Sequence, residues 1–117
     1  TRFSTRNNVR TAKLNKFNQQ LQVESVKKAL YKEIQQAYYN ALNSQAKYNG
    51  SIEARESANE HYLLTEEKYL NGKAGIAEYN DAKNNFLRAE SELLRSRYEC
   101  LFQVRLLDFY MGGDIVM

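Results

Sequence analysis

YLNGKAGI, residues 69–76, is the only tight cluster of helix-breaking residues in this 117-residue chain, which contains no proline. An Asn71-Gly72 pair followed closely by Gly75 is typical of a turn, because glycine reaches positive φ without steric cost. Helical spacing of apolar residues leads into this cluster and continues beyond it. The sequence therefore predicts an all-α chain, a single long antiparallel hairpin of two coiled-coil-like helices with its tip at residues 71–75.

The composition limits what the chain can be. With 117 residues it forms one domain at most, and 26% charged with 43% apolar residues argues against disorder. No apolar run approaches the ~20 residues that a membrane-spanning helix needs. Cys100 and His61 are each alone and lack metal-ligand spacing, so no metal or other cofactor is expected. No nucleophile–base pair or phosphate loop is visible, so an enzyme is not expected.

The first helix is predicted over about residues 4–70, with Ser4 or Thr5 as its N-terminal cap. Gly50 costs roughly 1 kcal/mol relative to alanine, which so long a helix tolerates, so the helix is expected to continue through it. Its apolar residues recur mostly at steps of three and four, the spacing of one helix face. They are Leu14, Phe17, Leu21, Val23, Val26, Leu30, Ile34, Ala37 and Ala41.

The second helix is predicted over about residues 76–111, capped by Gly112 and followed by a short tail, residues 112–117. One face forms a packing seam of alternating large and small residues at strict three-four spacing. The seam consists of Tyr79, Ala82, Phe86, Ala89, Leu93, Ser96, Cys100, Gln103 and Leu107. Leu87, Leu94 and Leu101 form a second line, seven residues apart, which indicates neighbours on two sides of this helix.

The two predicted helices differ in length. At 1.5 Å per residue the second helix folds back only to about Gln36, so the first ~35 residues have no partner within the hairpin. Those residues nevertheless carry an apolar stripe, and each large side chain left in water forfeits roughly 1.5–3 kcal/mol. The chain is therefore expected to be oligomeric, bent back on itself, or part of something larger.

A basic stripe marks the start of the chain. Arg2, Arg6, Arg10, Lys13 and Lys16 precede the first acidic residue, Glu24. The i, i+4 spacing of the three arginines places them on one helix face. A solvated basic face is the favoured interpretation, and a phosphate-binding stripe of a nucleic-acid-binding protein is the weaker one, because no nucleic-acid motif accompanies it. No nucleic-acid partner is expected.

Several motifs, in this order and spacing, resemble the repeat signature of TolC-like outer-membrane efflux proteins. The tip and its flank match a Tyr, a Gly three residues on, an apolar residue four after the Gly, and an acidic-Ala pair. These are Tyr69, Gly72, Ile76 and Asp81-Ala82. Further similarities are the start at Phe3, Arg10 and Ala12, the stretch 85–93, Arg97-Tyr98, and the ending Leu107, Tyr110 and Gly112.

The resemblance implies a place for the chain in a larger assembly. Members of the family are trimers that close a β-barrel in the outer membrane of Gram-negative bacteria and an α-helical barrel across the periplasm. The chain resembles the last hairpin of the second repeat, and is expected to be a fragment or truncated gene product. Membrane contact is then expected only through parts absent from this chain. The implied function is a wall segment of an efflux or secretion duct, with a periplasmic adaptor and an inner-membrane pump as partners.

The resemblance also assigns a role to the tip, which would form the aperture and the adaptor-docking point. The residues concerned are Tyr69, Asn71, Gly72, Lys73, Ala74, Gly75, Ile76, Glu78, Tyr79 and Asp81. Ala74 stands where the best-known member has an arginine, so an arginine-based latch is not expected here. Two alternatives remain: Tyr69 and Tyr79 simply pack across the turn, or the chain is a coiled-coil interaction protein with no transport role.

Overall fold

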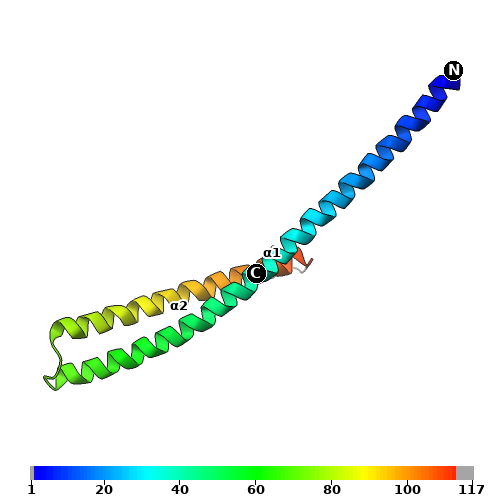
Figure 1. The fold of residues 1–117 in the computed structure, drawn as a ribbon. Helices are drawn as coiled ribbons and strands as arrows, with labels where there is room; N and C mark the ends of the chain where they lie inside the picture. The colour runs from blue at the N-terminus through cyan, green and yellow to red at the C-terminus, as the bar shows by residue number, and fades with distance from the viewer. Residues whose placement is uncertain (1, 113–117) are drawn as a thin grey trace. The chain divides into compact units, whose positions relative to one another are not determined.

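A computed structural model describes residues 2–112 and contains two helices joined by a turn. Helix α1 spans Arg2–Leu70 and helix α2 spans Ile76–Tyr110, and the described residues contain no strand. Figure 1 shows the turn that joins the two helices. The predicted all-α hairpin class is thereby confirmed. The expected tail after Gly112 lies outside the described residues.

The start of α1 differs from the sequence-based expectation. Ser4 and Thr5 lie inside the helix, which already begins at Arg2, so neither is its N-terminal cap. Serine and threonine cost only a few tenths of a kcal/mol in an exposed helix, so nothing at these positions stops the helix from extending further toward the N-terminus. Gly50 is likewise helical.

The chain divides into two units, Thr1–Gln36 and Ala37–Met117. In the first unit every residue from 2 to 33 is exposed, including the apolar side chains of Leu14, Phe17 and Leu21. The hairpin itself lies in the second unit and does not extend into the first. The reason is length, since the 35 residues of α2 can cover only a similar length of α1.

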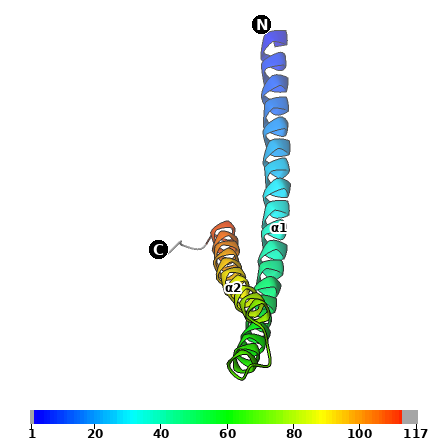
Figure 2. The ribbon, with the colours of Figure 1, turned by 90° about the vertical axis from the view of Figure 1, so that its left-hand side faces the viewer.

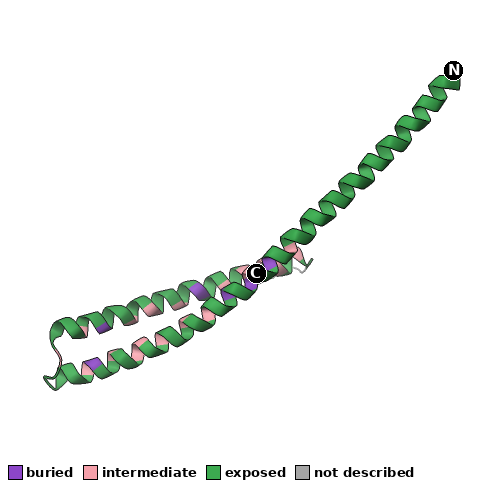
Figure 3. Ribbon diagram, viewed as in Figure 1, coloured by how far each residue is buried: buried purple, intermediate pink, exposed green. Residues whose placement is uncertain are grey.

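In the second unit α2 runs antiparallel beside the part of α1 that precedes the turn (Figures 1 and 2). The buried and half-buried residues follow the sides on which the two helices face each other (Figure 3). The most buried positions carry small side chains, with Ala82 1% and Thr65 2% exposed. Small residues let two helix backbones approach closely, and large neighbours fill the spaces between them.

Half of the buried positions among residues 2–112 are polar, and each has its hydroxyl satisfied locally. Ser44 Oγ donates to the Ala41 carbonyl at 2.9 Å, and Thr65 Oγ1 donates to the His61 carbonyl at 2.8 Å. A buried hydroxyl without a partner would cost about 1–3 kcal/mol, so these bonds to the preceding helical turn make the burial acceptable. The fully buried positions among residues 2–112 are thus alanine and hydroxyl residues, and larger side chains such as Phe86 and Leu93 are half-buried beside them.

Helix α2 has two different faces. Its nine seam residues are buried or half-buried, from Tyr79 near the tip to Leu107 near the other end. Leu87, Leu94 and Leu101 lie outside the seam, and their side chains are 48%, 52% and 51% exposed. The helix ends as Met111 N–H donates to the Leu107 carbonyl and Gly112 adopts φ 82°. One face of α2 is closed by α1, and the leucine line remains available.

Candidate functional site

The turn is a glycine-terminated helix end of the Schellman type. Lys73 N–H donates to the Lys68 carbonyl at 2.7 Å, and Gly72 N–H donates to the Tyr69 carbonyl at 3.1 Å. Gly72 has φ 75°, the left-handed conformation that this motif requires at its penultimate position. A side chain there would be strained, which explains why the sequence has glycine at this point.

Gly75 has a different role from Gly72. Its φ of −79° and ψ of 164° are accessible to any residue, and it is the N-cap of α2. Tyr79 N–H donates to its carbonyl at 3.1 Å, but a glycine supplies no side-chain oxygen to cap the free N–H groups. Of the two glycines, Gly72 is required by the left-handed backbone of the turn, whereas Gly75 leaves the start of α2 without a side-chain cap.

Aromatic rings join the two helices behind the turn. Tyr69 stacks on Tyr79 with ring centroids 4.9 Å apart and an interplanar angle of 20°. Tyr62 lies on the other side, 5.8 Å from Tyr79 and 5.6 Å from Phe86. Such ring pairs contribute about 0.5–1.5 kcal/mol each beyond the area they bury. The packing of Tyr69 against Tyr79 across the turn, one of the two alternatives drawn from the sequence, is present in the structure.

A guanidinium group continues this ring series away from the tip. The Arg55 Cζ atom lies 5.4 Å from the centre of the Phe86 ring, and Arg55 also pairs with Glu90 at 3.1 Å. Both charged side chains are more than a third exposed, 39% and 44%, so the ion pair contributes at most about 1 kcal/mol. We call Tyr69, Tyr79, Tyr62, Phe86 and Arg55 the aromatic ladder.

Two members of the aromatic ladder, Tyr62 and Arg55, were not singled out by the sequence. Both lie at seven-residue intervals before Tyr69, and Phe86 lies seven after Tyr79. A seven-residue repeat keeps side chains on one side of a coiled-coil helix, so this spacing was a usable signal. It was missed because an arginine and isolated tyrosines do not form an apolar stripe.

The hydroxyl groups of Tyr62 and Tyr79 lie 3.3 Å apart, and either can donate to the other. The hydrogen bond with Tyr62, followed by desolvation, raises the pKa of Tyr79 above its ordinary value of 10.0. The negative charge of Glu66 acts in the same direction and Lys83 opposes it. Tyr79 therefore remains a neutral hydrogen-bonding group throughout the physiological pH range.

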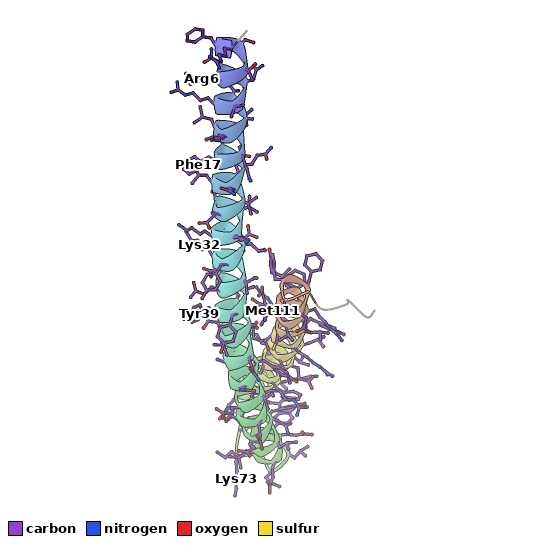
Figure 4. All side chains as sticks on the ribbon, turned by 90° about the vertical axis from the view of Figure 1, so that its right-hand side faces the viewer. Arg6, Phe17, Lys32, Tyr39, Lys73 and Met111 are labelled. Atoms are coloured by element: carbon purple, nitrogen blue, oxygen red, sulfur yellow. The ribbon has the colours of Figure 1, made fainter. Side chains whose placement is uncertain are left out.

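The charged residues predicted for the tip stand apart from the aromatic ladder. Lys73, Glu78 and Asp81 are exposed, and within residues 2–112 they form no ion pair. Ala74 is half-buried. Figure 4 labels Lys73 at the end of the hairpin. The charges at the tip are thus free for contacts outside this chain, whereas the aromatic residues are engaged within it.

Polar contacts also cross the seam farther from the tip. Ser96 Oγ lies 2.9 Å from Ser51 Oγ, and Ser51 in turn donates to the Lys47 carbonyl at 2.9 Å. Because the Ser51 proton is used in the bond to Lys47, the Ser96 hydroxyl donates to the Ser51 oxygen. This hydrogen bond links α2 to α1. The Oε1 atom of Gln103 is buried without a hydrogen-bond partner among the described residues.

The described residues contain neither a metal site nor a membrane span. No three His, Cys, Asp or Glu side chains gather closely enough in residues 2–112 to hold a metal ion. In the same part of the chain, neither helix has a stretch apolar enough and long enough to cross a bilayer. What the described geometry offers is a packing element: a hairpin with one closed seam, one open leucine line and an exposed polar tip.

These features define an antiparallel helical hairpin with one closed seam and one exposed leucine line. The model of the family of outer membrane efflux proteins matches residues 1–113, and the chain belongs to this family. No curated protein and no solved structure matches the chain. The family consists of efflux components rather than enzymes, in keeping with the packing character of the site.

Proposed function

We propose that the hairpin is a wall segment of the periplasmic α-helical barrel of an efflux or secretion duct. The observation that carries the proposal is the leucine line Leu87, Leu94 and Leu101, which stays about half exposed although the neighbouring seam is closed. Each leucine still has roughly 1 kcal/mol of burial free energy to gain. A barrel wall meets this need, since every helix there touches a neighbour on each side.

In this proposal the protein acts passively. The wall encloses a path for the transported substrate, and opening consists of helix movement at the tip. Lys73, Glu78 and Asp81 supply charges at the aperture and at the docking point of a periplasmic adaptor, itself joined to an inner-membrane pump. Because the aromatic ladder ties the two helices together behind the turn, the tip would move as one piece.

Self-association of the chain tests the wall role. In sedimentation velocity over a concentration series, we expect the chain to form trimers or other closed oligomers. Leu94→Lys should shift it toward the monomer, because a charge is then placed in the middle of the leucine line. Asn85→Lys adds the same charge to an exposed position on another face of α2 and serves as the control. A chain that stays monomeric at high concentration would instead support a coiled-coil protein without a duct.

Cross-linking tests the position of the tip. In a Cys100→Ser background, Lys73→Cys should form disulfides between copies quickly under mild oxidation, because the tips converge. Glu92→Cys lies on an exposed face away from the leucine line and should react slowly. Equal rates at both positions would mean that the tips do not meet.

A further inference from the structure

Two Asn-Gly pairs in the chain share one chemical property. They are Asn49-Gly50 and Asn71-Gly72. In such a pair the backbone nitrogen of the glycine can attack the side-chain carbonyl carbon of the asparagine, because no Cβ on the glycine obstructs the approach. The product is a five-membered imide, and the asparagine loses its amide. The two pairs therefore have the same intrinsic tendency to deamidate.

The surroundings of the two side chains are also alike. Asn49 and Asn71 are both exposed, and neither side chain forms a hydrogen bond within residues 2–112. Beyond the adjacent backbone, no atom lies within 4 Å of a Cβ built at Gly50 or Gly72. Access for solvent therefore does not distinguish the two pairs, and only the conformation of the backbone does.

The backbone at Asn49 opposes imide formation. The ring closes only when ψ of the asparagine leaves the helical range, about −42°, and turns the next nitrogen toward the side chain. Asn49 and Gly50 lie within α1, where hydrogen bonds from residue i to residue i−4 hold ψ on both sides. Interrupting a helix in its interior requires a new nucleation, which reduces the open population about 1,000-fold. Asn49 is thus held in a conformation that does not react.

The backbone at Asn71 is much less restricted. Helix α1 ends at Leu70, and the Gly72 N–H is held by a single bond to the Tyr69 carbonyl at 3.1 Å. A rotation of the peptide unit between Asn71 and Gly72, with opposite changes of ψ and φ, breaks only that bond. Glycine permits this rotation because both signs of φ are accessible to it. One such bond favours the closed turn by about five-fold.

From this contrast we infer that Asn71 is a site of spontaneous deamidation at the tip, whereas Asn49 is protected by its helix. A bond forms between the Gly72 nitrogen and the Asn71 Cγ atom, and the nitrogen gives up its proton to solvent. The Cγ–Nδ2 bond breaks, and Nδ2 takes up a proton and leaves as ammonia. Water then opens the imide, mainly to isoaspartate and partly to aspartate. The inference stands on the turn alone and holds whether or not the hairpin forms a duct.

The reaction changes the tip in two ways. It adds a carboxylate at the end of the hairpin, two residues before Lys73 (Figure 4). Isoaspartate also inserts a methylene group into the main chain directly before Gly72, whose φ of 75° and bond to Tyr69 define the turn. The longer main chain displaces both. Deamidation therefore alters the charge of the tip and loosens its backbone.

Peptide mass spectrometry of the whole chain tests the inference, because trypsin separates the two pairs. Cleavage after Lys47 and Arg55 releases residues 48–55, and cleavage after Lys68 and Lys73 releases residues 69–73. The chain is incubated at mildly alkaline pH, in buffer and in guanidinium chloride. Each peptide is then followed for the conversion of its amide into an acid.

The expected rates differ between the two pairs only in the folded chain. In guanidinium chloride both asparagines should react at similar rates, since the helix and the turn are lost. In buffer Asn71 should slow by at most about ten-fold and Asn49 by at least about 100-fold. The acid form of the peptide 69–73 should elute as two products, isoaspartate and aspartate. Equal rates at the two sites in buffer, whether both fast or both slow, would overturn the inference.

A variant separates the added charge from the altered backbone. Asn71→Asp carries the carboxylate on a normal main chain and should lower the Tm only slightly, through a negative charge at the C-terminal end of α1. Chain deamidated at Asn71 and isolated by ion exchange is mainly the isoaspartate form, and its Tm should be lower than that of Asn71→Asp. Equal Tm values would contradict the loosening of the turn.

Discussion

Gly72→Ala is the change that most directly tests the geometry of the turn. Gly72 has φ 75°, and its N–H bonds the Tyr69 carbonyl at 3.1 Å, so the hairpin needs the left-handed conformation here. An alanine in that conformation costs about 1–2 kcal/mol from its Cβ. It also reduces the freedom of the unfolded chain, which returns about 0.4–1 kcal/mol. The net loss should be about 1 kcal/mol.

Thermal unfolding followed by circular dichroism measures this loss. For a unit of this size, 1 kcal/mol corresponds to a Tm decrease of about 4–8 °C. The scans must be made at one protein concentration, because self-association would itself shift the Tm. Gly72→Asn should lose less, since asparagine tolerates the left-handed region better than alanine does.

Gly75→Ser is the matched control. No atom lies within 4 Å of a Cβ built at Gly75, and its φ of −79° suits any residue. The serine hydroxyl can cap the start of α2, so the Tm should stay unchanged or rise by the equivalent of a few tenths of a kcal/mol. If Gly72→Ala left the Tm unchanged, or Gly75→Ser lowered it more, the reasoning on the turn would be refuted.

Three further changes probe the hairpin away from the turn. Gly50→Ala should raise the free energy of unfolding by roughly 0.5–1 kcal/mol, because the site is helical and open around the added methyl group; a lower Tm would contradict this. Ser96→Ala removes the hydroxyl that meets Ser51 across the seam and should cost about 1 kcal/mol in urea unfolding, whereas Ser91→Ala, on an exposed position, should cost little. Since the pKa of Tyr79 is raised in the folded state, its contribution to stability is complete below about pH 10 and is lost as the pH rises through the raised value. Tyr62→Phe should lower the Tyr79 pKa in an NMR titration of ring-labelled tyrosine, and an unchanged value would dismiss the hydroxyl pair as its cause.

Several features could be predicted from particular residues. The Asn71-Gly72 pair indicated the turn because only glycine takes positive φ readily, and the observed φ of 75° at Gly72 agrees. The strict three-four spacing on α2 indicated one packing face, because such spacing aligns side chains on a helix. The tip motif, centred on Tyr69 and Gly72, indicated the family to which the chain belongs. The role of the tip in docking stays a prediction.

The facing side of α1 could not be predicted in the same way. Ser44 and Thr65 are buried although they are polar, because their hydroxyl groups bond to carbonyls of the preceding turn. Hydropathy alone assigns such residues to the solvent side. The N-terminal cap was placed too late for a related reason, since Ser4 has the chemistry of a cap but also fits within a helix.

The sequence by itself determined the two helices, the position of the turn, the packing face of α2 and the basic stripe at the start of α1. These follow from local backbone preferences and from periodicity, which act within a few residues along one helix. The tertiary structure alone decided which α1 residues meet α2, and it assembled Tyr69, Tyr79, Tyr62, Phe86 and Arg55 into the aromatic ladder. Such contacts depend on the register of two helices, which is set by how their small residues interlock and not by either helix alone.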